Sequence, residues 1–175
     1  MDIVLILQDI RSLHNVGSIF RTADAFGVSK IWLCGYTGTP PRKEISKVAL
    51  GAETWVPWER RKGTALLVSR LKADGYQVIA LETGPWSEPI SQVRVRRNVA
   101  LILGNEIDGI SHGLLHRADA IAAIPMLGMK GSLNVSVAAG VALALLRAAE
   151  AGKKKRKVLG PSVRRRGARS ARRPR

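Results

Sequence analysis

The stretch IPMLGMKGSLNVSVAAGVALALLR, residues 124–147, joins the end of an apolar strand to a long apolar helix. The loop between them contains Gly128 and Gly131, which can adopt backbone angles that other residues avoid. Ser132 and Asn134 are good helix N-caps, and the free N–H groups at a helix start suit an anionic ligand group. The sequence therefore predicts a strand, a glycine-containing loop and a helix that begins at Ser132 or Asn134.

The helix expected over residues 135–149 has apolar side chains on every side. They are Val135, Val137, Ala138, Val141, Leu143, Leu145 and Leu146. Such a helix is normally covered on two sides, either inside a large core or at a subunit interface. Because the chain is short, we expect a homodimer interface here.

The 175 residues predict one domain with a tail. No run approaches the roughly 18 consecutive apolar residues of a membrane helix, and no signal-peptide pattern precedes Ile3. A single cysteine, Cys34, rules out a disulfide framework and a cysteine-rich metal site, and its place in IWLCG predicts a buried strand residue. We therefore expect a soluble, cytoplasmic protein with no membrane segment.

Charge is divided unevenly along the chain, which has a formal net charge of +16. Residues 1–150 hold all 13 acidic residues and 17 of the 29 basic ones, whereas residues 151–175 hold 12 basic residues and no acidic one. Without apolar periodicity, residues 151–175 are predicted to be a disordered tail. Lysine and arginine in such a tail favour salt-sensitive binding to RNA phosphates, with nuclear import through KKKRKV as the alternative.

Apolar runs alternate with helical patterns along residues 1–150. Strands are expected at residues 3–7, 31–34, 78–81, 99–103 and 120–124, with a broken strand at 54–58. Helices are expected after Asn15, which can cap the first of them, at 43–50 and around 66–71. This alternation predicts an α/β fold with a mainly parallel sheet covered on both faces.

Three loops that leave apolar strands carry polar side chains. The first reaches Asn15 and Arg21, the second carries Asn105 and Glu106, and the third carries Ser132 and Asn134. Ligands of open α/β sheets bind beyond the carboxyl ends of the strands, so convergence of these loops would form one cleft. Each residue also has a structural alternative, because Arg21 could pair with the acidic residue at i+3, Glu106 could brace a turn, and the others could be helix caps.

Several common sites are missing from the sequence. There is no GxGxxG after a strand and no GxxxxGK[ST] loop, which argues against a redox dinucleotide enzyme and a phosphate-loop nucleotidase. His112 and His116 are four residues apart but lack the glutamate and third ligand of a zinc site. We interpret them as surface residues and expect no metal.

Together, the three stretches closely resemble the three motifs of the SpoU (TrmH) family of RNA ribose 2′-O-methyltransferases. NVGSIFRTADAFGV resembles the first motif and supplies Asn15 and Arg21. ALILGNEIDGIS resembles the second, with Glu106, and the stretch quoted at the outset resembles the third, with Ser132 and Asn134. The resemblance covers residues 1–150 in the order and spacing of the family.

This resemblance implies a SPOUT fold with a C-terminal trefoil knot, S-adenosylmethionine as the methyl donor, and a homodimer formed through helices near the knot. It implies cofactor contacts from nine residues, many of them through the backbone. They are Leu81, Glu82, Thr83, Gly104, Ile124, Met126, Ser132, Leu133 and Asn134. It also implies that Arg21 activates the ribose 2′-hydroxyl, in some accounts as a general base. An equally physical role for Arg21 is to donate hydrogen bonds to the developing alkoxide, with an RNA phosphate or Glu106 assisting proton loss. Asn15 and Ser132 would then orient Arg21, and Asn134 would shape the cofactor pocket.

Among RNA substrates the sequence favours tRNA over rRNA. Many rRNA-modifying members of the family carry an N-terminal RNA-binding domain, whereas here the first strand is expected at Ile3. Trp55, Trp58 and Trp86 lie in or beside loops and could stack on bases. The alternatives are an rRNA methyltransferase, a related knotted enzyme that methylates a base, and a non-catalytic RNA-binding protein of the same fold.

Overall fold

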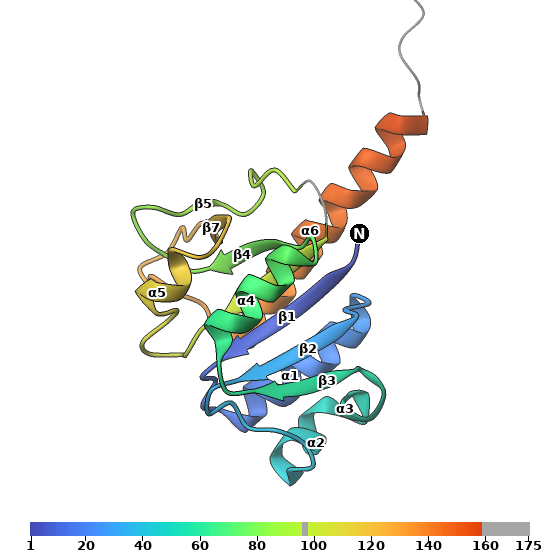
Figure 1. The fold of residues 1–175 in the computed structure, drawn as a ribbon, viewed down its shortest axis with the longest axis vertical. Coiled ribbons are helices and arrows are strands. Elements are labelled where there is room, and N and C mark those ends of the chain that lie inside the picture. Colours follow the sequence, from blue (N-terminus) through green and yellow to red (C-terminus); the bar gives the residue numbers. More distant parts are fainter. Residues whose placement is uncertain (96–97, 159–175) are drawn as a thin grey trace, which may run out of the picture.

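The computed structural model describes residues 1–95 and 98–158 and contains one seven-stranded parallel sheet, in the order β3-β2-β1-β6-β4-β7-β5 (Figure 1). The strands are β1 (Ile3–Gln8), β2 (Lys30–Cys34), β3 (Trp58–Arg61), β4 (Gln77–Leu81), β5 (Glu88–Pro89), β6 (Val99–Leu103) and β7 (Ala120–Ala123). Every strand pair is parallel. The predicted α/β class with a mainly parallel sheet is confirmed, whereas the trefoil knot stays a prediction. All carboxyl ends of the strands lie at one edge.

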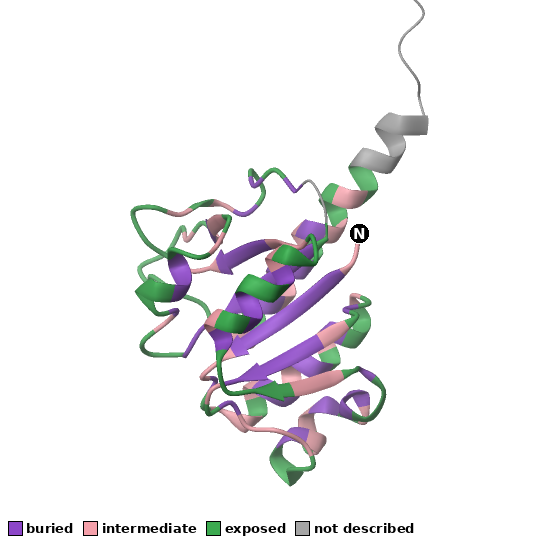
Figure 2. Cartoon of the chain, viewed as in Figure 1, coloured by how far each residue is buried: buried purple, intermediate pink, exposed green. Residues whose placement is uncertain are grey.

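Helices cover both faces of the sheet. They are α1 (Leu13–Ala25), α2 (Lys43–Ala49), α3 (Ala52–Trp55), α4 (Thr64–Ala73), α5 (His112–Leu115) and α6 (Val135–Val158). Alternate residues of β1 face the two sides. Leu5 belongs to the buried cluster that contains residues of α1, α2, α3 and α6, whereas Ile6 belongs to the cluster that contains residues of α4 and α5. The inner strands are therefore apolar without interruption, as Figure 2 shows by their burial.

Two local predictions are wrong near the first helix. Residues 54–58 were expected to form a broken strand, but α3 occupies Ala52–Trp55 and β3 starts only at Trp58. Ala52 and Val56 are both buried, and their four-residue spacing is that of one helical face, so packing against α1 selects the helix. Asn15 does not cap α1; the side chain of Ser12 does, accepting a hydrogen bond from the Asn15 N–H at 3.3 Å.

Helix α6 is longer than expected and covered on one side only. It continues to Val158 instead of ending at residue 149. The disordered tail stays a prediction, and residues 159–175 of it lie outside the described residues. Lysine and arginine are good helix formers, and cations are favourable at a helix C-terminus. One side of α6 packs in the core through Ala139, Ala142, Leu143 and Leu146, whereas Val137 is 50% exposed.

Residues 135–152 of α6 are long and apolar enough, by length and composition, to cross a bilayer. A single helix of this kind is weak evidence, because core helices of soluble proteins have the same properties. Here four of its side chains are in the core, and Arg147 ties it to the body. The expectation of no membrane segment stays a prediction.

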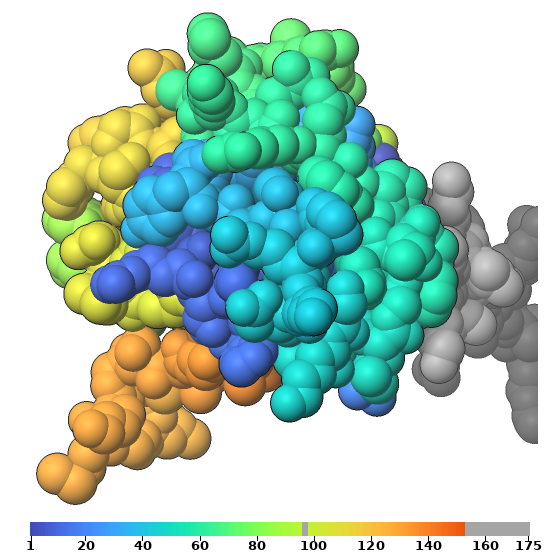
Figure 3. Space-filling model, turned by 90° about the horizontal axis from the view of Figure 1, so that it is seen from below, coloured from blue at the N-terminus to red at the C-terminus, as the bar shows by residue number. Residues whose placement is uncertain are grey.

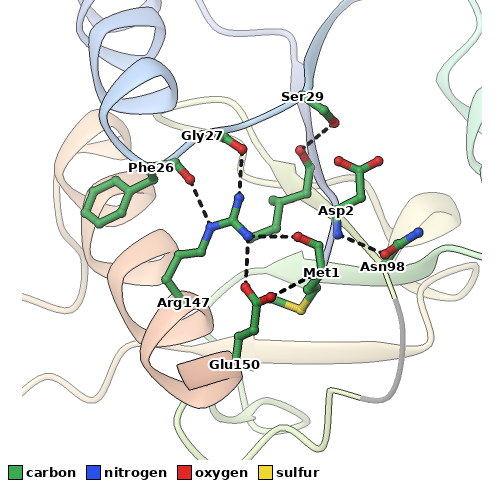
Figure 4. A network of polar contacts seen from close by, with 9 residues as sticks. Met1, Asp2, Phe26, Gly27, Ser29, Asn98, Arg147 and Glu150 are labelled. Atoms are coloured by element: carbon green, nitrogen blue, oxygen red, sulfur yellow. Dashed lines mark hydrogen bonds and ion pairs between the residues drawn. The ribbon is translucent and has the colours of Figure 1, made fainter. Parts of the chain in front are cut away.

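Arg147 fastens α6 to the amino ends of β1 and β2 (Figure 4). Its guanidinium donates to the carbonyl oxygens of Phe26 at 2.9 Å, Met1 at 2.8 Å and Gly27 at 2.7 Å, and to the carboxylate of Glu150 at 3.1 Å. Glu150 also binds the α-ammonium group of Met1 at 2.7 Å. These contacts hold the helix that follows the third motif in a fixed position against the sheet.

Candidate functional site

A cavity of about 450 Å³ lies where β4, β6 and β7 end, within the roughly 300–1,000 Å³ range of small-molecule sites. It is lined by all nine residues predicted to contact the cofactor: Leu81, Glu82, Thr83, Gly104, Ile124, Met126, Ser132, Leu133 and Asn134. The carboxyl ends of parallel strands meet at one edge, and this explains why segments far apart in the sequence converge. Asn105, expected on one of the converging loops, also lines the cavity. Sequence reasoning missed further lining residues, including Leu103, Ile107, Asp108, Gly109, Val135 and Ala138.

The loop after β6 is held rigidly at the cavity. The Asn105 Oδ1 atom accepts from the backbone N–H groups of Ile107 at 2.8 Å and Asp108 at 2.9 Å. The Glu82 carboxylate accepts from the Ile110 N–H at 2.7 Å. Gly104 admits no side chain, because a Cβ there would lie 2.5 Å from the backbone of Gly109. The loop can therefore close over the strand ends only with glycine at position 104.

Asn15, Glu106 and Asn134, one from each motif, form a hydrogen-bonded relay at the cavity. Asn15 Nδ2 donates to Glu106 Oε1 at 2.9 Å, and Asn134 Nδ2 donates to Asn15 Oδ1 at 3.1 Å. Asn134 Oδ1 accepts from the Ser136 N–H at 2.9 Å and so caps α6. An ionised carboxylate only accepts, so Glu106 fixes the orientation of both amides. The predicted cap at Asn134 is confirmed.

The carboxylate of Glu106 is ionised at neutral pH. Burial alone would raise the pKa of Glu106, but hydrogen bonds from the Arg11 N–H, the Asn15 amide and the Ser12 N–H outweigh burial and lower that pKa below its ordinary value. A carboxylate stabilised in this way is a poor proton acceptor. Its geometry suits the fixing of α1 to the loop after β6.

The structure does not bring Arg21 to the cavity. Arg21 is exposed on α1 and is absent from the described residues that line the cavity. It lies six residues after Asn15, which places it about 9 Å along the helix and about 120° around it. The alternative ion pair between Arg21 and Asp24 is also not formed among the described contacts. The Asp24 carboxylate instead accepts a hydrogen bond from Trp55 Nε1 at 2.9 Å.

The remaining candidates are peripheral to the cavity. His112 and His116 are both exposed, and His112 contacts Trp86 edge-on. Within residues 1–95 and 98–158, no group of three His, Cys, Asp or Glu side chains could hold a metal, and the absence of a metal stays a prediction. Cys34 is buried as expected, and burial raises the pKa of its thiol to about 11.

The cavity is acidic in a strongly basic chain. Its described lining residues include the carboxylates of Glu82, Glu106 and Asp108 and no Lys, Arg or His side chain. Leucine, isoleucine, alanine and methionine side chains form much of the rest. Such a lining favours a ligand that combines an apolar part with a positive charge.

An open parallel sheet with this cavity beyond three strand ends defines an α/β domain that binds a small molecule. The chain belongs to the SpoU rRNA methylase family, whose model matches residues 2–144.

Relatives of the chain modify different RNAs. The 23S rRNA (guanosine-2′-O-)-methyltransferase RlmB of Vibrio vulnificus is 33% identical over 81% of this chain and 57% of its own length. The tRNA (guanosine(18)-2′-O)-methyltransferase of Aquifex aeolicus is 32% identical over 81% of this chain and 67% of its own length. An AdoMet-bound rRNA methyltransferase from Sinorhizobium meliloti has a TM-score of 0.79 and 32% identity over 85% of this chain and 56% of that protein. The chain thus spans roughly 57–67% of the length of these curated relatives.

Proposed function

We propose that the protein is an S-adenosylmethionine-dependent RNA ribose 2′-O-methyltransferase. The observation that carries this proposal is the Asn15–Glu106–Asn134 relay, which joins all three motifs at the cavity. Membership of the SpoU family supports the reaction, and the names of two relatives specify ribose 2′-O-methylation.

The cavity fits S-adenosylmethionine in size and charge. The three lining carboxylates suit its sulfonium and ammonium charges, and the apolar side chains suit the adenosine rings. When bound, this cofactor supplies a methyl group on an electron-poor sulfur. Glu82, Gly104, Leu133 and Asn134 would hold it, in part through backbone groups of the loops after β4, β6 and β7.

Residues of this chain must position the ribose and stabilise the oxygen that loses its proton. A guanidinium holds its proton to a pKa above about 12, so we assign Arg21 to donating hydrogen bonds to the developing alkoxide. Because Glu106 already accepts three hydrogen bonds, we assign it to holding Asn15 and leave proton removal to an RNA phosphate or water. Ser132, at the cavity, is placed to orient the ribose or Arg21.

We further propose a homodimer in which Arg21 acts on the site of the partner. Apolar residues left exposed or half-exposed on α6 recur at helical spacing: Val137, Val141, Ala144 and Ala148. This stripe has the spacing of a helix–helix seam, and α1 packs beside α6. A two-fold axis through the stripe would place α1 of one protomer near the cavity of the other, which accounts for a motif arginine outside its own cavity.

The dimer proposal predicts complementation between two inactive variants. We expect Arg21→Ala and Asn134→Ala each to be inactive and a mixture, after subunit exchange, to recover about a quarter of wild-type activity through one intact site per mixed dimer. A mixture that stays inactive despite exchange would place Arg21 and Asn134 in the same protomer's site.

For substrate, we propose tRNA, with rRNA as the alternative that the Vibrio relative supports, and we propose a cytoplasmic location. The test is methyl transfer from labelled S-adenosylmethionine to undermodified total RNA, followed by size separation. Label in the tRNA band supports the full proposal, label in rRNA supports the alternative, and resistance to alkaline cleavage at the labelled nucleotide identifies the ribose as the acceptor. Absence of label in all RNA, with cofactor binding intact, would overturn the enzymatic proposal.

Arg21→Lys tests the role of the guanidinium. Lysine keeps the charge but loses the planar fork of donors, so we expect activity to fall about 100-fold, the effect of removing one donor to a developing oxyanion. Near-full activity of the variant would show that charge alone suffices and would refute the assigned geometry.

A further inference from the structure

The carboxyl edge of the sheet is divided into an acidic and a basic half. The strand order places the cavity at the ends of β6, β4 and β7. The ends of β1, β2 and β3 continue the same edge on the other side of β6. Figure 3 shows the segments that follow β2 (light blue), β1 (dark blue) and β6 (yellow) side by side. With strands about 4.8 Å apart, this second half extends about 14 Å from the cavity.

Exposed cations occupy that second half. Arg11 follows β1, Arg42 ends the loop that follows β2, and Lys62 follows β3, and all three are exposed. The backbone of Arg11 is held next to the cavity, because its N–H donates to Glu106 Oε2 at 3.0 Å. We refer to Arg11, Arg42, Lys62 and Tyr36 as the basic edge.

Carboxylates near the basic edge are largely engaged. Glu59 binds Lys30 at 2.9 Å and Arg61 at 2.5 Å. Asp9 accepts hydrogen bonds from the Gln8 side chain and from the Tyr36 N–H. On α2, Glu44 is balanced by the exposed neighbours Lys43 and Lys47. The basic edge therefore keeps a net positive charge.

Tyr36 gives this edge an aromatic ring next to the cavity. The ring is 57% exposed, yet both of its ends are anchored. Its backbone N–H donates to Asp9 Oδ1 at 2.9 Å, and its hydroxyl accepts from Asn105 Nδ2 at 2.7 Å. Asn105 itself lines the cavity. Large exposed rings that are held in one orientation are suited to stacking on bases.

The backbone conformation of the turn at residues 9 and 35 fixes the position of Tyr36. Asp9 has a positive φ of 56°, uncommon for a residue other than glycine. Gly35 has φ 62°, and a Cβ there would lie 1.9 Å from the Asp9 carboxylate. The turn that presents Tyr36 thus requires glycine at 35 and strain at Asp9, and such strain clusters at functional sites.

We infer that the basic edge is the docking track for the substrate RNA strand, with Tyr36 stacking on a base beside the target nucleotide. This inference rests on the proposed function. Phosphates of the strand would contact Arg11, Arg42 and Lys62, while the acidic lining of the cavity would attract the cationic cofactor. The division of charge along one sheet edge thus separates the two ligands.

The test uses the full chain with undermodified RNA and compares Tyr36→Ala, Tyr36→Phe, Arg11→Ala and Lys62→Ala. Arg70→Ala is the matched control, because Arg70 lies on α4 away from this edge with a 72% exposed side chain. We measure RNA binding by fluorescence anisotropy over a range of salt, cofactor binding by calorimetry, and KM and kcat for methyl transfer.

We expect Tyr36→Ala to weaken RNA binding at least about fivefold by loss of stacking, and Tyr36→Phe to restore it. Arg11→Ala and Lys62→Ala should each reduce the slope of log K against log salt by about 0.7. Cofactor binding should stay at the wild-type level in all variants, and Arg70→Ala should match the wild type throughout.

The outcomes separate this inference from the proposed function. If the wild type methylates RNA but the edge variants keep its RNA affinity, salt slope and KM, the inference is overturned and the proposed function stands. If the RNA affinity of Arg70→Ala falls as far as that of the edge variants, the attraction between protein and RNA is spread over the whole surface, and the inference is overturned as well. If the wild type neither binds nor methylates RNA while binding the cofactor, the proposed function fails and the inference with it.

Discussion

Replacing Asn15 by aspartate tests the relay directly, because it exchanges one NH2 group for an oxygen. In the wild type that NH2 group donates to Glu106 Oε1 at 2.9 Å. The new carboxylate would face an ionised one. Two unit charges about 4 Å apart repel by about 4 kcal/mol at an effective dielectric constant of 20 and by about 1 kcal/mol in water. Glu106 is exposed, so we expect a loss near 2 kcal/mol.

That loss should lower Tm by about 4–8 °C at pH 8 for a chain of this size. As the pH falls toward about 5, the deficit should shrink, since two adjacent carboxylates share a proton and regain a donor. Asn15→Ala is the control, because it lacks the group that titrates and should show a constant deficit over this range. The assay is thermal unfolding from pH 5 to 8, with and without S-adenosylmethionine. A variant that unfolds at the wild-type temperature at pH 8 would refute the hydrogen-bond orientation assigned to the relay.

Three further predictions follow from single contacts. Gly104→Ala should abolish the thermal shift caused by S-adenosylmethionine, because its Cβ meets the Gly109 backbone, whereas Gly113→Ala, with nothing within 4 Å, should keep that shift. Arg147→Met should lower the free energy of unfolding in urea by about 2–4 kcal/mol, since the hydrogen bonds of a charged group are lost; an unchanged midpoint would contradict this. The pKa of Glu106 is lowered on folding, so its contribution is present above its unfolded pKa of about 4.3 and is lost as the pH falls through the lower folded value. The stability difference between wild type and Glu106→Gln should therefore be constant from pH 6 to 8 and vanish in acid, and a difference that persists there would argue against this linkage.

Burial on both faces made most strands predictable. Val99–Leu103 is apolar at every position because it lies in the middle of the sheet, and a buried parallel strand has no polar face. The broken strand expected at residues 54–58 failed because that segment lies at the periphery, where the contact with α1 decides between helix and strand. Helix α6 runs past its predicted end at residue 149 because lysine and arginine are good helix formers, so a run of cations does not mark a helix end.

The sequence by itself determined the three motifs and the parallel α/β class, since these depend on residue types and spacing along the chain. The resemblance to the SpoU family, and not the spacing, predicted nine of the residues that line the cavity. Only the tertiary structure decided that Asn15 turns to Glu106 instead of capping α1, that Arg21 lies outside its own cavity, and that Tyr36 reaches Asn105. Each of these joins segments whose distance depends on the order of strands in the sheet. Strand order is set by how both faces are covered at once, and no local pattern in the sequence encodes it.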